Sequence, residues 1–571
     1  MVSARRIVPT ERRLPLASNV LVIRTRIQIL TGIRWRPTEP QILFVLLFTV
    51  YFVAACYLTL VANVIYGDAW SRVEIAYRIL SSRDPHLAAI GFIWGPLPEI
   101  PLLPLVALKA LWPQLVTSSL AGGIVSSLCM AGGAVQLRGF VADAGLSRPF
   151  VWMLTAAFAL NPVILMYGAN GMSEAMLLLF LLSATRSLAR WLRDDSLNSL
   201  ILTGVFLALA YLTRYESLGA AASVTAAVAL VSYVRVRRAG GQLWAVANDV
   251  LLVAAPWAFA FVVWAAASWI ITGQPFEQLT SGYGNSAQVG SIYVNRTRVP
   301  TGYTAWSWTL VRLMLSQLLL LAPALPLVPL YKVGRLSRSA ISLAVAAVAC
   351  IGGAVAFIVA AQVAGELAHP LRYLIGVVPL AVALAGACIA ANQSRQHQEG
   401  RRAAAGLSVA CALTLFVALP TSAFAMLDAT TDPWSFTSNR SIVSSAPDNA
   451  LGGHLNWSNE RKIAADLDAM HLPKGAVLVD DFLGFPIVVS SGDPTQFVIT
   501  SDRDFETVVA DPKGLGVRYI LVPVPDVLGS LDAINRQYPG FYASGGGFAS
   551  LVNEYPATGV NDTTFRLFRI N

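Results

Sequence analysis

The chain has 571 residues, of which 56% are hydrophobic and 13% charged, and its formal net charge is +9. Apolar runs of about one membrane span, roughly 20 residues each, recur along it, which excludes a soluble globular or disordered chain and indicates a polytopic α-helical membrane protein. The basic residues lie in short clusters between these runs, as membrane topology requires, so we expect the lipid bilayer and no nucleic acid as partner. All five cysteines lie inside apolar runs, without metal-ligand spacing.

The N-terminal segment 1–40 is rich in arginine, and the positive-inside rule places it in the cytoplasm. The first apolar run, 41–65, is too long for a signal-peptide core and is expected to stay as a transmembrane helix. It crosses outward, so Asp68 arrives on the outer side. From Ala69 to Leu80, apolar residues at three-to-four spacing predict an amphipathic helix that lies along the interface.

The next apolar stretch, 102–112, is short and interrupted by prolines. If it does not cross the membrane, every later basic cluster falls on the inner side, so we interpret it as re-entrant or interfacial. About eleven spans, or up to 13 with an additional broken pair, are then expected in a transmembrane domain over 41–427. Their ranges are 41–65, 116–137, 150–167, 172–190, 197–213, 217–234, 246–272, 305–331, 338–361, 368–391 and 403–427.

This topology leaves the polar residues that are typical of active sites on the side of Asp68. The outer segments are the loop 66–96, residues 168–174, residues 213–216, the long loop 273–304 and residues 365–373. The inner connectors are mainly Arg-rich. The loop 273–304 is either a mobile lid over a site or an ordinary polar loop.

After residue 427 the long apolar runs stop, and Asp, Asn, Gly and Pro become frequent. We expect a small extracytoplasmic α/β domain over 428–571, on the same side as Asp68. Asp480 and Asp481 follow the first predicted strand and are interpreted as turn residues. The predicted strands are 476–479, 485–489, 497–499, 519–522 and 565–570, and the predicted helices are 460–470 and 527–537.

The order of these features resembles that of the GT-C glycosyltransferases, in particular the branch of protein O-mannosyltransferases and lipid A aminoarabinose transferases, which use polyprenyl-phosphate sugars. The shared pattern is a first span, an acidic residue that opens the first outer loop, an interfacial helix, and a set of short motifs in a fixed order. Here the matching positions are Asp68, Gly95-Pro96-Leu97-Pro98, Met172-Ser173-Glu174, Leu212-Thr213-Arg214-Tyr215-Glu216 and His369-Pro370-Leu371-Arg372-Tyr373.

The sequence departs from the family's pattern at two points. Trp94-Gly95 stands where the family has His-Pro, so any role of that histidine is lost. Asp68 has no adjacent acidic partner, unlike the paired acids of metal-dependent oligosaccharyltransferases, so we expect neither a metal nor another cofactor.

The resemblance implies a membrane glycosyltransferase that moves a hexose or pentose from a polyprenyl-phosphate sugar to a hydroxyl of a glycan, lipid or protein. Such a reaction needs a carboxylate that takes the acceptor's proton, and Asp68 is the candidate. It also needs a cation for the donor phosphate, for which arginine is well suited. The candidates are Arg372, then Arg214, then Arg72. Further substrate-binding candidates are Glu99, Glu174, Glu216, His369 and Tyr373.

Several of these candidates also have a purely structural interpretation. Asp68 is also a good N-cap for the helix from Ala69. Arg214 is a possible local partner of Glu216, and Arg372 is at a span end from which it can snorkel to the interface. The remaining candidates fit a helix-dipole role for Glu174, a water-facing position for Glu99 and a structural role for His369.

Two other functions compete with the transferase. A transporter or flippase of lipid-linked sugars should carry ionisable groups in the middle of its spans and two related halves, and neither is visible here. A non-catalytic envelope assembly protein would not need the outer set of Asp, Arg and Glu residues. We expect a multi-pass protein of a bacterial inner membrane, with a cytoplasmic N-terminus and an extracytoplasmic C-terminal domain.

Overall fold

The structure is a computed structural model. It describes residues 38–295, 320–328, 336–364, 366–367, 370–395, 401–428, 431–432, 439–440, 442, 457–557 and 563–571. The chain forms two units, 1–43 and 44–571. Of the first unit only the start of the first helix is described.

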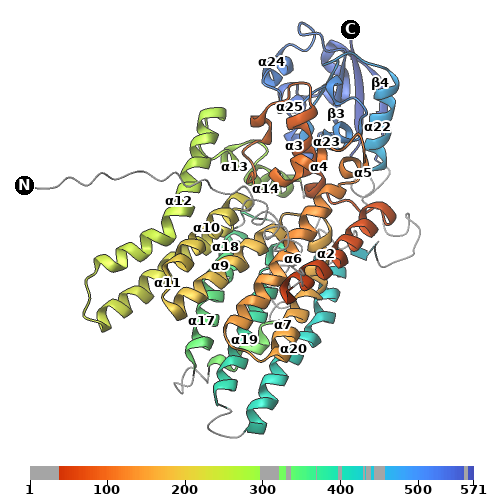
Figure 1. The fold of residues 1–571 in the computed structure, drawn as a ribbon. Helices are drawn as coiled ribbons and strands as arrows, with labels where there is room; N and C mark the ends of the chain where they lie inside the picture. The colour runs from red at the N-terminus through yellow and green to blue at the C-terminus, as the bar shows by residue number, and fades with distance from the viewer. Residues whose placement is uncertain are drawn as a thin grey trace, which may run out of the picture. The chain divides into compact units, whose positions relative to one another are not determined.

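Among the described residues, eight helices are long and apolar enough to cross a membrane, and one bent pair is a ninth candidate. The sequence therefore predicted the polytopic helical class correctly (Figure 1). The eight run over Glu39–Val61 (α2 and the π-helical turn η1), Leu120–Asp143 (α6), Glu174–Asp194 (α9), Ser217–Arg238 (α11), Trp244–Thr272 (α12), Arg338–Val363 (α17, η5 and α18), Leu371–Gln393 (η6 and most of α19) and Gly406–Leu427 (within α20, Arg401–Leu427).

The bent pair falls where the span 150–167 was predicted. Helices α7 (Arg148–Ala159) and α8 (Pro162–Ala169) meet at 61°. The side chain of Asn161 accepts a hydrogen bond from the backbone N–H of Val163, and Pro162 occupies the first helical position, so a new helix begins at this point. The predicted span 197–213 is the 17-residue helix α10 (Leu197–Thr213). The predicted span 305–331 lies mostly outside the described residues.

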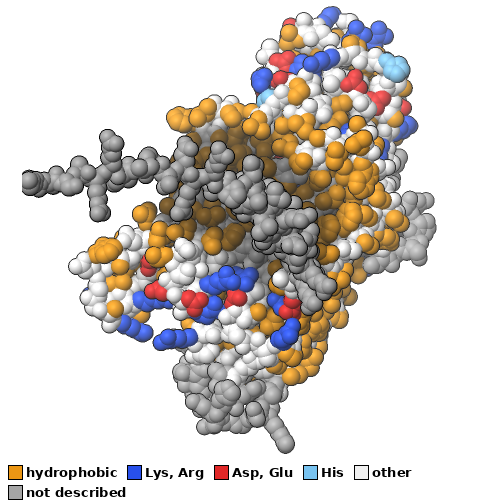
Figure 2. Space-filling view, viewed as in Figure 1, with side chains coloured by type: hydrophobic (Ala, Val, Ile, Leu, Met, Phe, Trp, Pro, Cys, Tyr) orange, Lys and Arg blue, Asp and Glu red, His pale blue; other side chains and the backbone are white. Residues whose placement is uncertain are grey.

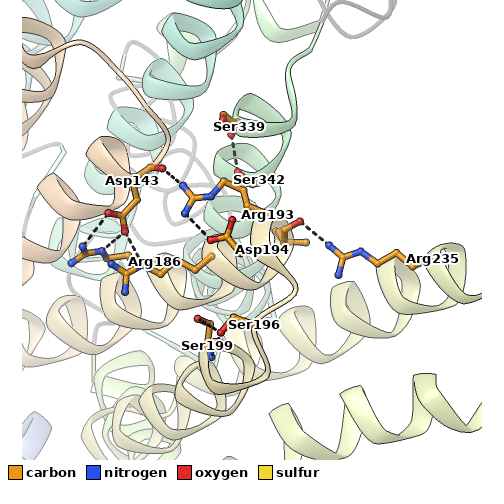
Figure 3. A network of polar contacts seen from close by, with 11 residues as sticks. Asp143, Arg186, Arg193, Asp194, Ser196, Ser199, Arg235, Ser339 and Ser342 are labelled. Carbon is orange, nitrogen blue, oxygen red and sulfur yellow. Dashed lines mark hydrogen bonds and ion pairs between the residues drawn. The ribbon is translucent and has the colours of Figure 1, made fainter.

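The described spans pack side by side in an order that brings distant parts of the chain together. Helix α9 lies against α6, α10 and α17, and α19 (Val377–Arg395) packs against both α17 and α20. At the C-terminal end of α9, Arg186 and Arg190 both donate to the carboxylate of Asp143, and Arg235 of α11 reaches Asp195 (Figure 3). The predicted Arg-rich connectors are therefore partly neutralised by aspartates.

The stretch 97–112 contains only short helical pieces, η3 (Ile100–Leu102) and α4 (Leu103–Val106). Neither is long enough to span a bilayer, which needs about 20 residues in a helix. Another short helix, α5 (Gln114–Thr117), precedes α6. These short segments (97–117) pack against helix α3 (Gly67–Ser81), the helix that follows the first span, and are called the shelf below.

Helix α3 matches the predicted amphipathic helix and is longer by two residues at its start. Its apolar face contacts protein on several sides: Trp70, Val73 and Tyr77 pack in one cluster with Leu102, with Val116 and other residues of the shelf, and with Phe485 and Val489 of the C-terminal region. Only Leu80, at 45% exposure, departs from the predicted stripe. The C-terminal region therefore covers the helix that carries Asp68.

The C-terminal region from residue 457 folds around a five-stranded mixed sheet in the order β2-β1-β3-β5-β4. The first three strands of this order are parallel, and β5 and β4 are antiparallel to their neighbours. Helices pack on both faces, which gives the predicted α/β class. The strands are β1 (Val477–Val479), β2 (Phe497–Val498), β3 (Tyr519–Pro523), β4 (Ala549–Tyr555) and β5 (Phe565–Ile570).

Alternation along the strands decides which helices cover which face. Val477 and Val479 contact one helical layer, whereas Leu478 contacts the other. Aliphatic and aromatic side chains thus form two cores, one on each side of the sheet. The first layer is α22 (Ser458–Ala469) and α23 (Asp481–Ser490), and the second contains α24 (Phe505–Ala510), α25 (Ala533–Gln537) and α26 (Phe541–Ser544). The short helix η9 (Val527–Leu531) precedes α25.

Two predictions for this region were wrong. Residues 485–489 were predicted to be a strand but lie within α23, because a fully apolar run of this length fits a buried helix as well as a buried strand. Strand β4 was not predicted, because five of its seven residues are exposed and it lies at the edge of the sheet. The view in Figure 2 shows hydrophobic side chains over the spans, with charged side chains gathered on the C-terminal region and in a second group near the helix ends.

Candidate functional site

Four residues from distant parts of the chain meet at one end of the membrane helices. Asp68 lies in the first turn of α3, and Glu174 is the first residue of α9. Arg214 is the C-cap of α10, and Arg372 lies in the short helix η6 (Leu371–Leu374) that leads into α19. The sequence predicted that these residues share one side, and the structure brings them into a single ionic cluster.

The central contact of the cluster joins the predicted base to the first-choice phosphate ligand. Arg372 Nη2 lies 2.6 Å from Asp68 Oδ2. The Asp68 side chain is 46% exposed and that of Arg372 19%, so the pair opens to the exterior on the Asp68 side. The guanidinium of Arg372 also lies over the ring of Tyr373, 5.2 Å from the ring centroid.

Glu174 lies behind this pair and holds both arginines. Its Oε1 accepts a hydrogen bond from Arg214 Nη1 at 3.1 Å and lies 4.0 Å from Arg372 Nε. Glu174 is 1% exposed, and its second carboxylate oxygen has no hydrogen-bond partner among the described residues. Arg214 also reaches Glu216 Oε1 at 2.5 Å and lies over the ring of Tyr373. Two arginines are thereby fixed side by side.

The segment before Glu174 explains how this carboxylate is placed. Gly171 has a φ of 83°, a conformation that favours glycine, and a side chain there would come within about 3.1 Å of the backbone of Gly122 in α6. The side chain of Asn170 accepts a hydrogen bond from the N–H of Met172 at 3.1 Å. This tight turn starts α9 with Glu174 pointing at the arginines.

Arg72 forms a second buried ion pair one turn further along α3. Its Nη1 lies 2.5 Å from Glu99 Oε1, and its guanidinium lies 4.6 Å from the centroid of the Trp94 ring. Arg72 also lines a cavity of about 10 Å³ together with Ser126 and Ser173, roughly the space of one water.

The Trp94-Gly95 dipeptide, where the family pattern has His-Pro, has a clear structural role here. A side chain on Gly95 would come within 2.3 Å of the Leu212 carbonyl oxygen, so only glycine permits this approach. The N–H of Leu97 donates to the same carbonyl at 3.0 Å. Tyr215 donates its hydroxyl to the Ile93 carbonyl at 2.6 Å. The loop therefore fixes the end of α10, where Arg214 sits.

Several structural interpretations can now be decided. Asp68 is not an N-cap, because α3 begins at Gly67 and its N-cap is Tyr66. Glu99 does not face water, since it is 1% exposed. The local pair of Arg214 with Glu216 and the first-turn position of Glu174 are both confirmed, and each residue makes further contacts as well.

Arg372 faces protein partners, so snorkelling from the span end does not describe it. His369 lies outside the described residues. Within the described ranges, His, Cys, Asp and Glu form no group of three or more that could hold a metal ion.

The charges of the cluster act on Asp68 in opposite directions. Burial by itself raises the pKa of the Asp68 carboxyl, but the guanidinium of Arg372, with smaller contributions from Arg72 and Arg214, lowers the pKa below its usual value. Asp68 is therefore ionised in this arrangement. It is also a weaker proton acceptor while Arg372 is bound to it.

A second set of ionisable groups, which the sequence pattern did not reveal, lies further along α3. Arg78 Nη1 lies 2.6 Å from Asp481 Oδ2 and 3.4 Å from Glu74 Oε2. Asp480 and Asp481, interpreted as turn residues, are both buried. The one available signal was that they follow a parallel strand, an edge where functional groups often gather.

No family model matches the chain, and no curated protein matches it. In structure it is similar to ArnT from Cupriavidus metallidurans bound to undecaprenyl phosphate, at 13% identity and a TM-score of 0.44, over 92% of this chain and 97% of that one. The apo ArnT structure gives 14% identity and a TM-score of 0.43 over the same shares.

A third similar structure is the archaeal oligosaccharyltransferase AglB from Archaeoglobus fulgidus, in complex with an inhibitory peptide and a dolichol-phosphate. It gives 10% identity and a TM-score of 0.37, over 90% of this chain and 73% of that one. At this level of identity the likeness is one of fold.

Proposed function

We propose that the chain is a membrane glycosyltransferase that moves a sugar from a polyprenyl-phosphate donor to an acceptor hydroxyl on the outer face of a bacterial inner membrane. The observation that carries the proposal is the ion pair of Asp68 with Arg372 at the opening of a buried cluster of arginines and carboxylates. A base and a phosphate ligand are the two groups that this reaction needs, and here they are in contact.

The charge balance of the cluster supports an exchange at Arg372. The cluster together with its ion-paired neighbours Arg72, Glu99 and Glu216 contains three arginines and four carboxylates, a formal charge of −1 when all are ionised. An arriving phosphate therefore needs a cation that can be released from an internal partner. Arg372 is such a cation, because its partner Asp68 is half-exposed. The residues counted are Arg72, Arg214, Arg372, Asp68, Glu99, Glu174 and Glu216.

In the proposed reaction, the donor phosphate takes the place of Asp68 at Arg372. Glu174 keeps Arg214 and Arg372 in position, so that the planar guanidinium of Arg372 can pair with phosphate oxygens. Once released from Arg372, the Asp68 carboxyl loses the interaction that lowers its pKa and becomes a better proton acceptor. Phosphate binding thereby activates the base.

The chemical step then follows from this arrangement. The acceptor oxygen forms a bond to the anomeric carbon while the bond from that carbon to the phosphate oxygen breaks. The proton of the acceptor hydroxyl passes to Asp68, and the negative charge that develops on the leaving lipid phosphate is held by Arg372. Three further residues support these groups. Glu99 pairs with Arg72 and Glu216 pairs with Arg214, while the ring of Tyr373 lies beneath the guanidinium of Arg214.

The test is binding of undecaprenyl phosphate to the purified protein, measured by native mass spectrometry in lipid nanodiscs. We expect the wild type and Asp68→Asn to bind this lipid and Arg372→Ala to lose it. Arg566→Ala is the matched control, because it removes an arginine that pairs with a carboxylate in the C-terminal sheet, away from the cluster. No binding by the wild type, or equal binding by the two Arg→Ala variants, would overturn the proposal.

A further inference from the structure

Asp480 and Asp481 lie side by side where strand β1 leads into helix α23. The Asp480 side chain caps α23 by accepting a hydrogen bond from the N–H of Phe482 at 2.8 Å. Both residues are buried, at 1% and 6% exposure. Two adjacent buried carboxylates are costly, since burial and the charge of Asp481 raise the pKa of Asp480 to about 6. Each of the two holds a different segment of the chain.

Asp481 holds the helix that carries the proposed base. Its Oδ2 lies 2.6 Å from Arg78 Nη1, and Arg78 also donates from Nε to the Ala89 carbonyl at 2.8 Å. Asp68 lies ten residues before Arg78 on the same helix, a distance of about 15 Å along the helix axis. Because Trp70 of this helix also packs against Phe485 of α23, α3 is held by both charge and apolar contact.

Asp480 holds the outer segment that follows α12. The hydroxyl of Tyr283 donates to Asp480 Oδ2 at 2.7 Å, and the guanidinium of Arg536 lies 4.9 Å from the centroid of its ring. In helix α14 (Asn285–Asn295), which begins two residues later, Ser286 donates to Glu366 at 3.4 Å. Glu366 precedes Arg372 by six residues in the chain.

The two aspartates therefore hold one segment that carries Asp68 and one that contacts the chain shortly before Arg372. We propose that Asp480 and Asp481 are positioning residues through which the C-terminal domain sets the geometry of the Asp68–Arg372 pair. This inference rests on the proposed function for its catalytic meaning. Its structural content is independent of that function: Asp481 orders α3, and Asp480 orders the segment around Tyr283 in addition to the starts of α23 and α25, where it accepts from the N–H groups of Phe482 and Ala533.

Hydrogen exchange of the full-length protein in nanodiscs tests whether the two aspartates order the segments that they contact. Asp481→Asn should speed amide exchange in α3 by about 10-fold, because a charge-assisted hydrogen bond is lost, and should leave 273–295 unchanged. Asp480→Asn should speed amide exchange in 273–295 and leave exchange in α3 unchanged. The control is Asp504→Asn, which removes a half-exposed partner of Arg83, just beyond α3, and should change neither segment.

Affinity for undecaprenyl phosphate, measured on the same samples, tests whether the two aspartates set the geometry of the Asp68–Arg372 pair. We expect Asp481→Asn to bind this lipid less tightly at an unchanged thermal midpoint, and Asp481→Glu to restore part of the affinity. If Asp481→Asn does not fold, Arg78→Lys probes the same contact from α3 and should give the same selective change. These outcomes separate positioning from a general loss of stability.

Exchange in α3 that is equal in Asp481→Asn and Asp504→Asn would overturn the inference, as would a uniform increase over the whole C-terminal domain. A wild type that binds no undecaprenyl phosphate would defeat the proposed function, yet the exchange measurement would still decide whether the aspartates position the two segments. The two failures are therefore distinguishable.

Discussion

Asp68→Asn is expected to tighten the binding of undecaprenyl phosphate, although it should abolish sugar transfer. In the wild type, Arg372 must leave Asp68 before it can pair with a phosphate, so the internal ion pair competes with the ligand. An amide is nearly the same size as the carboxylate but carries no charge. The substitution removes the competitor and also lowers the negative charge that the phosphate meets.

The size of the effect follows from the exposure of the pair. Asp68 is 46% exposed and Arg372 19%, so the interaction is screened by solvent and is worth about 0.2–1 kcal/mol. That corresponds to a gain in affinity of about 1.4- to 5-fold. Arg372→Ala removes the charge-assisted hydrogen bond to the ligand itself, worth about 1.5–3 kcal/mol, and should weaken binding by about 10- to 150-fold.

The assay is a titration of undecaprenyl phosphate against the protein in nanodiscs of zwitterionic lipid, read by native mass spectrometry at two salt concentrations. Glu554→Gln is the control, because Glu554 is a similarly exposed carboxylate, at 43%, that pairs with Arg566 in the C-terminal sheet. The gain from Asp68→Asn should shrink as salt rises, since salt screens exposed charges. Weaker binding by Asp68→Asn than by the wild type would refute the exchange at Arg372.

Glu74→Gln should flatten the pH dependence of the thermal midpoint. Burial, together with the charge of Asp481, raises the pKa of Glu74 from 4.5 to about 8. Between these pH values the folded wild type holds a proton that the unfolded chain releases, so the wild type loses stability as pH rises. A thermal midpoint of Glu74→Gln that declines as steeply as that of the wild type between pH 5 and pH 8 would contradict this expectation. Trp70→Ala should lower stability by about 3–5 kcal/mol in denaturant titrations, because the ring is fully buried and its N–H donates to the Val116 carbonyl; a loss below about 1 kcal/mol would show that the shelf does not hold α3. Alkaline phosphatase fused after Asn571 should be active and a fusion to the N-terminal tail inactive, and the opposite pattern would reverse the proposed topology.

Local patterns in the sequence were sufficient for the spans and for most of the C-terminal sheet. Run length identifies membrane helices, because a bilayer of fixed thickness demands about 20 apolar residues whatever their neighbours are. The described helices accordingly fall where the spans were predicted, with α10 as a shorter member. The chain order of Asp68, Glu174, Arg214 and Arg372 at span ends also identified the group of residues that the structure brings together.

Pairing within that group was decided only by tertiary structure. Glu99 was predicted either to bind the acceptor or to face water, and nothing in its neighbourhood of prolines shows that Arg72 lies opposite it. The apolar residues 485–489 were predicted to be a strand, because they satisfy a buried strand and a buried helix equally well until the cap at Asp480 and the cluster around Trp70 fix the choice.

The sequence by itself thus determined which residues form apolar helices of membrane-spanning length and which charges collect at one end of these helices, since both follow from the cost of placing polar groups in a bilayer. Only the packed structure determined that Arg372 pairs with Asp68, and that Asp480 and Asp481 hold two different segments. An ion pair forms where folding places two side chains within about 4 Å, and that distance depends on the packing of every helix between them.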